Sequence, residues 1–372
     1  MVSIFVFTVK NQPTRLLEVK GLSAVADMQL QKYHFQDQMS KNAPIVKRLI
    51  HLLSGHMSLK ASEPRDKLYA LLGLLGGHHD VPALIPDYDK PMETFYTDIA
   101  RYIVLSTNSL FPLAVSAAEV LSRNLSVPSW VPLLKNNYAI EDDSLDLITS
   151  YPKVSVSGDG KRLAARVSDC FGVVKAIHLL PAAQLVVERF LMSLYDIESK
   201  LDTCSIRQRL RSLESTETKA TLSQAFAEFL FQQAAQTTSP TYDDDKDRFK
   251  MLYYWYRLES SGSKASERTQ KIIDMQLELV SHTVYLGVSG GKFFELSTGY
   301  FGFAAGESTD LETGDFIYGL PGARRPTTFR RSDGNFRVCS ACHVYPFPVA
   351  ASESEFWRLL KEKDAWIDIT IE

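Results

Sequence analysis

The sequence of 372 residues has few cysteines, no excess of either charge and no long hydrophobic run. Its four cysteines are too few and too scattered for a disulfide framework, and they favour a reducing compartment. The 41 basic and 44 acidic residues give a net charge of -3, so no overall field attracts nucleic acid or an anionic membrane. These absences exclude a disulfide-stabilised secreted domain and argue against a nucleic-acid-binding protein.

The sequence also lacks the features of an exported or membrane-spanning chain. No segment reaches the roughly 18 consecutive apolar residues that a membrane span needs. The apolar stretch over residues 1–9 has no basic segment before it and no small-residue cleavage site after it, so it predicts a strand and not a signal peptide. We therefore expect a soluble, cytoplasmic protein without a membrane span.

Helical periodicity dominates the first third of the chain. Apolar residues recur at helical spacing in residues 44–55, 62–75 and 89–106. In the third of these segments Asp89 precedes the apolar pattern and is the expected N-cap. Residues 1–135 are therefore predicted to form a mostly helical N-terminal body.

The pattern changes at residue 151. Two alternating segments flank the turn Gly158-Asp159-Gly160, which is typical of a β-hairpin, and residues 170–180 predict a third strand. Helical patterns then return in residues 182–236, 247–259 and 267–280. Residues 136–282 are therefore predicted to form a central small sheet with helices.

Short aromatic and β-branched segments, separated by glycine-containing turns, follow one another between residues 282 and 347. Such strands close most easily into a small barrel or sandwich. A capping box at Ser352 and Glu355 begins a predicted helix over residues 352–363. The sequence thus predicts an α+β fold whose last part, residues 283–372, is a small β-barrel or sandwich closed by a helix.

Four motifs occur in the same order as in the heterokaryon-incompatibility (HET) family of filamentous fungi. SEPRDKLYALLGL at residues 62–74 resembles the family's DPRDKVYALLGL, and IPDY at residues 85–88, with the helix that follows, resembles PDYS…VYTEVARYL. PSWVP at residues 128–132 resembles LPSWVPDW, and residues 293–342 resemble GYLGLGP…GDVV…GECYVHG. The residues that carry the resemblance are Pro64, Arg65, Asp66, Lys67, Tyr69, Asp87, Tyr88, Tyr96, Arg101, Pro128, Trp130, Pro132, Gly299, Gly302, Gly314, Asp315 and Cys342.

The resemblance covers roughly residues 45–345 and implies a non-enzymatic protein of fungal allorecognition, which acts in programmed cell death after fusion of unlike cells. It implies a protein partner, no catalytic residue, no cofactor and no metal, so the motif residues are expected to be structural or recognition positions. The family's N-terminal half, with a TIR-like α/β core, should precede residue 45, but nothing in residues 1–44 matches it. We therefore expect a truncated HET domain in this chain.

A second hypothesis stays open: an accessory protein or enzyme of a fungal biosynthetic gene cluster, which binds an apolar metabolite in a pocket lined by aromatic side chains. The aromatic content of 11% allows such a pocket without predicting it. The sequence contains no G-x-S-x-G elbow, no H-E-x-x-H pair and no phosphate-binding loop. The identity of the partner and the oligomeric state also stay open.

Residues 339–343, CSACH, have the C-x-x-C-H spacing of a haem-attachment site, and C-x-x-C also occurs in redox and zinc sites. Within a predicted strand, however, alternate side chains point to opposite faces, so Cys339 and Cys342 would face apart unless a bulge intervenes. A structural role is therefore favoured over haem, redox and zinc binding.

Several charged clusters allow two interpretations each. Arg65 and Asp66 are either a ligand-orienting pair at a helix N-terminus or, as we favour, an ion pair that fixes the next element and a carboxylate that supports the helix dipole. His78-His79-Asp80 and Asp243-Asp244-Asp245 are either metal ligands or solvated loops, and we favour loops. Arg330-Arg331 either meets an acidic partner or lies on a plain exposed hairpin, which we favour.

Overall fold

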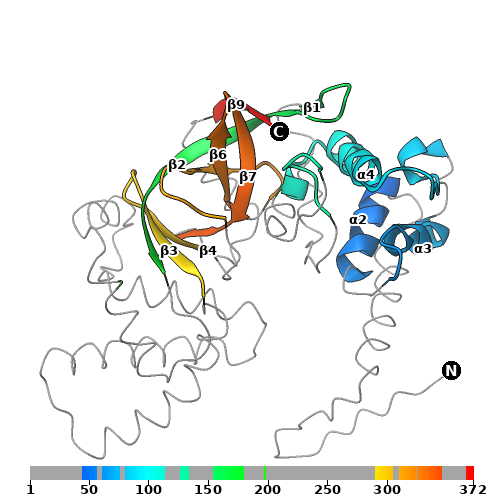
Figure 1. The fold of residues 1–372 in the computed structure, drawn as a ribbon, viewed down its shortest axis with the longest axis horizontal. Coiled ribbons are helices and arrows are strands. Elements are labelled where there is room, and N and C mark those ends of the chain that lie inside the picture. Colours follow the sequence, from blue (N-terminus) through cyan, green and yellow to red (C-terminus); the bar gives the residue numbers. More distant parts are fainter. Residues whose placement is uncertain are drawn as a thin grey trace, which may run out of the picture.

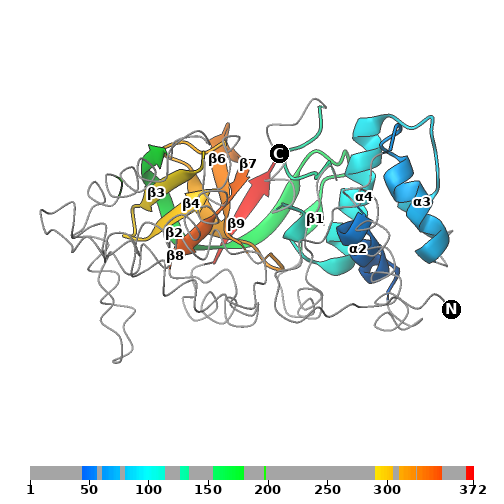
Figure 2. The ribbon, with the colours of Figure 1, turned by 90° about the horizontal axis from the view of Figure 1, so that it is seen from below.

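The structure is a computed structural model, and it describes residues 44–56, 61–75, 80–113, 126–133, 154–179, 197, 290–304, 310–323, 325–345 and 366–372. In these residues a group of helices lies beside a twisted sheet (Figure 1), and a view turned by 90° keeps the two apart at opposite sides (Figure 2). The predicted α+β class is therefore confirmed for the described part of the chain.

Within the described residues, the helical unit contains three α-helices whose bounds are known. They are α2 (Ile45–His56), α3 (Asp66–Leu75) and α4 (Met92–Thr107), and a short 3-10 helix, η2 (Pro82–Leu84), precedes α4. The three amphipathic patterns predicted in residues 44–106 thus correspond to helices, because each buries its apolar face in one shared core. None of the helices in the described ranges is long and apolar enough to cross a membrane.

The start of α4 corrects one prediction. The helix begins at Met92 with Pro91 at the N-cap position and without a side-chain cap, so Asp89 is not the N-cap. Asp87 supplies the carboxylate here, since its Oδ1 accepts hydrogen bonds from the backbone N–H groups of Asp89 (2.9 Å) and Lys90 (3.2 Å). Proline needs no partner for its nitrogen at a helix start, and the Asp87 side chain stabilises the turn before it.

Five strands close into a barrel. Four of them come from the last part of the chain, where the sequence predicted a small barrel or sandwich, and the fifth, over residues 163–179, comes from the predicted central part. β5 pairs with β6, β6 with β7, β7 with β9, β9 with β2, and β2 with β5 again. The second half of β2, with β3, β4 and β8, extends this sheet beyond the barrel. The strands are β1 (Ser155–Val156), β2 (Leu163–Leu179), β3 (Lys292–Leu296), β4 (Phe301–Ala304), β5 (Phe316–Gly319), β6 (Thr327–Ser332), β7 (Asn335–Ala341), β8 (His343–Tyr345) and β9 (Trp366–Ile371).

The long strand β2 corrects the prediction of a separate central sheet. The hairpin of β1 and β2 forms as expected, but the second and third predicted strands are one strand of 17 residues. Its first half pairs with β9, and its second half, from Val174 on, pairs with β3. The change of partner falls where the register with β5 shifts, between Ser168 and Gly172. The central segment therefore belongs to the same sheet as the C-terminal strands, because one continuous strand serves both.

The barrel closes with a strand that the sequence analysis missed. Residues 366–371 form β9, which runs antiparallel to β2 from Leu163↔Ile371 to Ser168↔Trp366. The predicted closing helix over residues 352–363 lies outside the described residues. The same holds for the predicted strand over residues 1–9, for the helices predicted between residues 182 and 280, apart from Ile197, and for the first predicted strand of the C-terminal part, at residues 282–289.

One hydrophobic core runs from the helical unit into the barrel. It includes Ile103 of α4, the fully buried Trp130, and Phe329 of β6. Backbone hydrogen bonds also join the two parts, since the N–H of Leu110 donates to the carbonyl of Pro321 at 2.7 Å. A second core, with Phe171, Phe294 and Cys342 among its members, involves the second half of β2 with β3, β4 and β8.

Candidate functional site

Two of the sequence motifs meet at the N-terminal end of α3. The guanidinium of Arg65 forms an ion pair with Glu63 (Nε–Oε1 2.8 Å) and donates through Nη1 to the carbonyls of Tyr88 and of Lys90, the latter at 3.0 Å. The guanidinium carbon lies 5.8 Å from the centre of the Tyr88 ring, within the range of a cation–π contact. Arg65 therefore fastens the loop of residues 85–90 to the start of α3.

Two tyrosines complete this arrangement, which we call the Arg65 cluster (Glu63, Arg65, Asp66, Tyr69, Asp87, Tyr88 and Lys90). The Tyr69 hydroxyl donates to the Asp87 carbonyl and accepts from the Asp87 N–H, at 3.0 Å each. The Tyr88 hydroxyl donates to Asp66 Oδ1 at 2.6 Å, and the two rings meet edge-on with centroids 5.2 Å apart. The polar atoms of the cluster thus hold one another, and the loop acquires a fixed shape.

These contacts shift the pKa values of two groups in the Arg65 cluster. The hydrogen bonds from Arg65 hold the pKa of the Glu63 carboxyl below its ordinary value, so the ion pair stays charged. The hydrogen bond to Asp66 raises the pKa of the Tyr88 phenol, so this hydroxyl remains a protonated donor. Since Asp66 is also the first residue of α3, its carboxylate supports the helix dipole.

The surface around this cluster is unusually apolar. Tyr88 is 55% exposed, Leu74 on α3 is 55% exposed, and Ile85 in the loop is 49% exposed. Arg65 is held by its partners, with only 12% of its side chain exposed. Aromatic and apolar side chains beside an ordered arginine are typical of surfaces that bind proteins.

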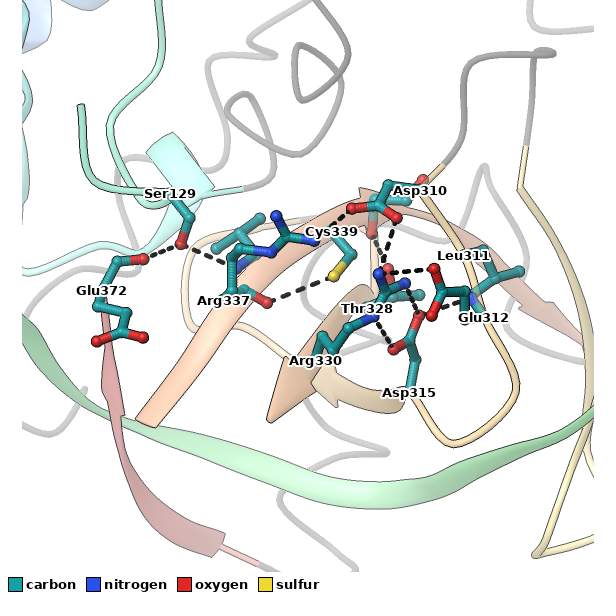
Figure 3. A network of polar contacts seen from close by, with 12 residues as sticks. Ser129, Asp310, Leu311, Glu312, Asp315, Thr328, Arg330, Arg337, Cys339 and Glu372 are labelled. Atoms are coloured by element: carbon teal, nitrogen blue, oxygen red, sulfur yellow. Dashed lines mark hydrogen bonds and ion pairs between the residues drawn. The ribbon is translucent and has the colours of Figure 1, made fainter. Parts of the chain in front are cut away.

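The third motif joins the helical unit to the barrel. The N–H of Ser129 donates to the Glu372 carbonyl at 3.0 Å, its hydroxyl donates to the same carbonyl, and this hydroxyl accepts from the N–H of Val338 in β7 at 3.0 Å (Figure 3). Trp130 is fully buried beside it, and no partner for its indole Nε1 is found within the described residues. Pro132 is buried and Pro128 half-buried, so residues 128–132 form a rigid connection between β7 and β9.

The fourth motif contributes a buried carboxylate to a second ionic arrangement, the Arg330 cluster (Asp310, Glu312, Asp315, Arg330 and Arg337). Arg330 on β6 reaches Asp315 through Nε (2.9 Å) and Nη2 (3.0 Å), a two-pronged contact in which Asp315 is only 2% exposed (Figure 3). Its Nη1 lies 3.0 Å from Asp310 and 2.9 Å from Glu312. Arg337 on β7 adds a contact of 2.8 Å to Asp310.

This cluster corrects the interpretation of Arg330 as part of a plain exposed hairpin. The side chain instead binds the segment of residues 310–315 to the sheet, and the hydrogen bond to Asp315 raises the pKa of the Arg330 guanidinium. The sequence alone does not predict this pair. Asp315 lies directly before β5 and Arg330 lies in β6, and the two meet only through the register Phe316↔Phe329. The one available signal in the sequence was a pair of arginines in a short strand that follows the acidic residues Asp310, Glu312 and Asp315.

The glycines of the fourth motif allow turns and close contacts. Gly299 and Gly314 have positive φ angles of 80° and 97°, which glycine adopts without strain. Gly302 lies within β4, where an added Cβ would fall 2.2 Å from Phe294 Cζ and 2.4 Å from the His343 carbonyl oxygen. Gly302 thus marks a position without room for a side chain, whereas Gly314 has open space around it and is required for its positive φ angle.

The two cysteines of the C-x-x-C-H sequence are buried free thiols. The register of β6 and β7 skips Cys339, since Thr328 pairs with Ser340 and Phe329 with Val338, so a bulge does intervene. Burial, followed by the negative charge of Asp315, raises the pKa of Cys339 to about 12. Burial also places the pKa of the Cys342 thiol far above its ordinary value, so neither thiol ionises at neutral pH.

The remaining motif residues lie on α4, on α3 and just before α3. Tyr96 is buried in the main core, and its ring lies edge-on to Phe95 at 5.2 Å. Arg101 is half-buried on α4, Lys67 is half-buried on α3, and Pro64 is exposed just before this helix. The histidines at 78 and 79 and the aspartates at 243–245 lie outside the described residues.

Comparisons with protein-family models, with curated proteins and with solved structures find no match for this chain. Among the side chains that the structure describes, no group of three or more His, Cys, Asp or Glu is arranged to hold a metal ion. The Arg65 cluster, the contacts of Ser129 and the Arg330 cluster are therefore the basis for a functional proposal.

Proposed function

We propose that this chain is a non-enzymatic interaction protein of the heterokaryon-incompatibility type, which takes part in fungal self/non-self recognition through a protein partner. The observation that carries the proposal is the meeting of the first two motifs in the Arg65 cluster, beside the exposed Leu74, Ile85 and Tyr88. A protein that recognises a partner needs a surface of fixed shape, and the Arg65 cluster gives such a shape to the loop of residues 85–90.

The chemistry of the cluster supports a binding role over catalysis. The polar side-chain atoms of the cluster are already hydrogen-bonded within the protein. Arg65 donates to the Glu63 carboxylate, Tyr69 to the Asp87 carbonyl and Tyr88 to the Asp66 carboxylate. A catalytic group needs a proton or a lone pair directed at a substrate, and these groups direct theirs at the protein itself. The part left open to a partner is the Tyr88 ring with its apolar neighbours, which suits a hydrophobic contact.

The test is controlled expression of the whole chain in a filamentous fungus, scored for growth arrest and vacuolation. The chain is compared with a version that carries a HET-type N-terminal half, and each is made with wild-type Tyr88, Tyr88→Ala and Tyr88→Phe. We expect arrest in at least the extended version, its loss with Tyr88→Ala, and its retention with Tyr88→Phe, because phenylalanine keeps the ring.

The two versions separate where the activity lies. If the chain arrests growth without the added half, residues 1–372 contain the toxic activity. If only the extended version arrests growth, this chain has a regulatory role. If neither version arrests growth, the incompatibility proposal is wrong. The alternative of an apolar-metabolite binder stays a prediction, and a ligand screen on the purified chain tests it.

A further inference from the structure

The two arginines of the Arg330-Arg331 pair lie on opposite faces of β6. Phe329, which precedes them, packs into the core of the barrel, so Arg330 points outward and Arg331 shares the inner face with Phe329, because side chains alternate along a strand. Arg331 pairs in register with Phe336 of β7, close to the turn that joins the two strands. Arg331 is exposed, so this side chain meets solvent at that end of the barrel.

Aromatic rings line the inner face beside Arg331. Tyr318 on β5 pairs in register with Thr327, and Phe316 pairs with Phe329, so these side chains share the inner face. The ring centroid of Phe336 lies 5.7 Å from that of Phe316 and 5.7 Å from that of Tyr318, edge-on to both. Phe316 and Phe336 are only half-buried, whereas Tyr318 is 2% exposed. Two of the rings are therefore open to a further contact at this end of the barrel.

Three polar groups near these rings lack a partner in the part of the chain that the structure describes. The Tyr318 hydroxyl forms no hydrogen bond there, although the residue is almost fully buried. The Asp169 carboxylate and the Arg331 guanidinium form no ion pair there, and the charges of both act on the Tyr318 phenol. The buried Oγ1 of Thr327, on the same face, is also without a partner. Because buried polar groups are nearly always hydrogen-bonded, unpaired ones on a single face indicate a place where a ligand binds.

An irregularity in β2 places Asp169 at this end of the barrel. The register of β2 with β5 skips between Ser168 and Gly172, so residues 169–171 lie opposite Tyr318 alone. Asp169 is exposed, yet the protein around its carboxyl raises the pKa of this group through burial. Burial, followed by the negative charge of Asp169, also raises the pKa of the Tyr318 phenol, so the hydroxyl stays a protonated donor at neutral pH. An open carboxylate and a buried donor thus lie close together.

We propose that this end of the barrel, the barrel-end site (Asp169, Phe316, Tyr318, Arg331 and Phe336), binds a small aromatic molecule that carries a carboxylate and a hydroxyl group. The mouth of a barrel is a common place for a small-molecule site, with apolar walls and a few polar groups. The inference goes beyond the incompatibility function, because the site shares no residue with the Arg65 cluster. It gives the alternative of a metabolite-binding protein a place in the fold and a class of ligand.

Each part of the ligand corresponds to one part of the barrel-end site. The unpaired guanidinium of Arg331 binds the carboxylate, since arginine forms charge-assisted hydrogen bonds with carboxylates. The Tyr318 hydroxyl donates to an oxygen of the ligand, and the Asp169 carboxylate accepts from the hydroxyl of the ligand. The half-buried rings of Phe316 and Phe336 pack against the aromatic ring. A molecule that lacks one of these groups leaves a polar group of the site unpaired, so it binds less tightly.

A ligand-observed NMR titration of the full chain tests the proposal with four probes. Para-hydroxyphenylacetate has all three features, phenylacetate lacks the hydroxyl, para-hydroxyphenylacetamide lacks the charge, and the cyclohexyl counterpart of the first probe lacks the aromatic ring. We expect a dissociation constant of roughly a millimolar for para-hydroxyphenylacetate, which is typical of a ligand of this size. The other three probes should bind about tenfold more weakly, because each loses one contact.

Four variants assign the contacts. Arg331→Gln and Tyr318→Phe should each weaken para-hydroxyphenylacetate about tenfold, and Arg331→Lys should restore part of the loss. Asp169→Asn should weaken para-hydroxyphenylacetate but not phenylacetate, which has no hydroxyl to donate. Arg166→Gln is the matched control, since Arg166 is an exposed arginine on the outer face of β2, between the inward-facing Ala165 and Val167. Arg331 and Asp169 are exposed, so their variants keep the test valid if Tyr318→Phe disturbs folding.

Three outcomes overturn the proposal. The first is the absence of saturable binding by any probe, which means that this end of the barrel is not a ligand site. The second is equal affinity for all four probes, which means that contact is non-specific. The third is a loss with Arg166→Gln as large as that with Arg331→Gln, which assigns binding to overall charge. None of these variants alters Tyr88 or the Arg65 cluster, so their failure is separate from a failure of the incompatibility proposal.

Discussion

Arg65 in the helical unit and Arg330 in the barrel each fasten a loop to a regular element, but they do so in different surroundings. Arg65 pairs with Glu63, whose side chain is 35% exposed, and otherwise donates to backbone carbonyls. Arg330 pairs twice with Asp315, which is 2% exposed. Solvent therefore screens the carboxylate of the first ion pair and hardly reaches the Asp315 carboxylate of the second. The comparison indicates that the helical surface tolerates change whereas the barrel does not.

The glycines of the two regions give the sharpest test of this difference. Gly302→Ala should prevent normal packing of β4, because its Cβ would lie 2.2 Å from the Phe294 ring and 2.4 Å from a backbone oxygen that cannot move aside. We expect a loss of about 3 kcal/mol or more, or a chain that does not fold. The matched change Gly73→Ala in α3 has open space around the new methyl group and should stabilise the protein by about 0.5–1 kcal/mol.

Urea unfolding of the two variants beside the wild-type chain measures both effects. Because one core joins the helices and the barrel, the described part should unfold as one unit, so the midpoints are comparable. Equal destabilisation by both alanines would contradict the contrast between a tightly packed sheet and an open helical surface.

The carboxylates that contact each loop give the next largest difference. Asp315→Ala removes the buried partner of Arg330 and leaves the guanidinium with Asp310 and Glu312. We expect a cost above about 1 kcal/mol but below the roughly 3–5 kcal/mol that is typical when a buried ion pair loses one partner completely. Asp66→Ala removes a half-buried carboxylate at a helix start and should cost less than about 1 kcal/mol. The same urea unfolding in low and in high salt checks the cause, since only the Asp66 effect should shrink as salt screens it.

Asp315→Asn separates charge from shape in this test. The amide keeps one hydrogen-bond acceptor for Arg330 and removes the negative charge. A loss as large as that of alanine assigns the effect to the charge, whereas a much smaller loss assigns it to packing and hydrogen bonding. A loss below about 1 kcal/mol for Asp315→Ala would show that the Arg330 cluster does not hold the loop.

The sequence was a good guide wherever a local pattern decides the structure. The repeat of Leu68, Leu71, Leu72 and Leu75 predicted α3, since these four leucines are its buried residues. Alternation and turn glycines likewise predicted the hairpin of β1 and β2 and most strands of the barrel. Amphipathic periodicity is encoded within a few turns or strand residues, so it can be recognised without the rest of the chain.

The contacts between distant segments could not be predicted in this way. β9 pairs with β2 across about 200 residues, and the Ser129 hydroxyl meets Val338 at a sequence separation of 209 residues. The partner of Arg330 depends on the register of β5 and β6, and a shift of one residue would turn the arginine to the other face. Closure and register are properties of the assembled sheet, so single motifs do not contain them.

Protonation gives a smaller and graded contrast between the regions. His343 in β8 is buried, and burial, aided by the positive charge of Arg325, holds the pKa of its imidazole well below 6.5. The folded sheet thus keeps this ring neutral, whereas the unfolded chain binds a proton below about pH 6.5. Stability from this site is complete above that pH and is lost as the pH falls, by up to about 1.4 kcal/mol per pH unit. The lowered pKa of Glu63 acts only below about pH 4.3, so on acidification the effect of His343 should appear before that of Glu63. Urea unfolding between pH 7.5 and 5 measures the slope, and His343→Gln should flatten it. An unchanged slope in this variant would mean that other groups cause the acid sensitivity and that the buried ring of β8 contributes nothing to it.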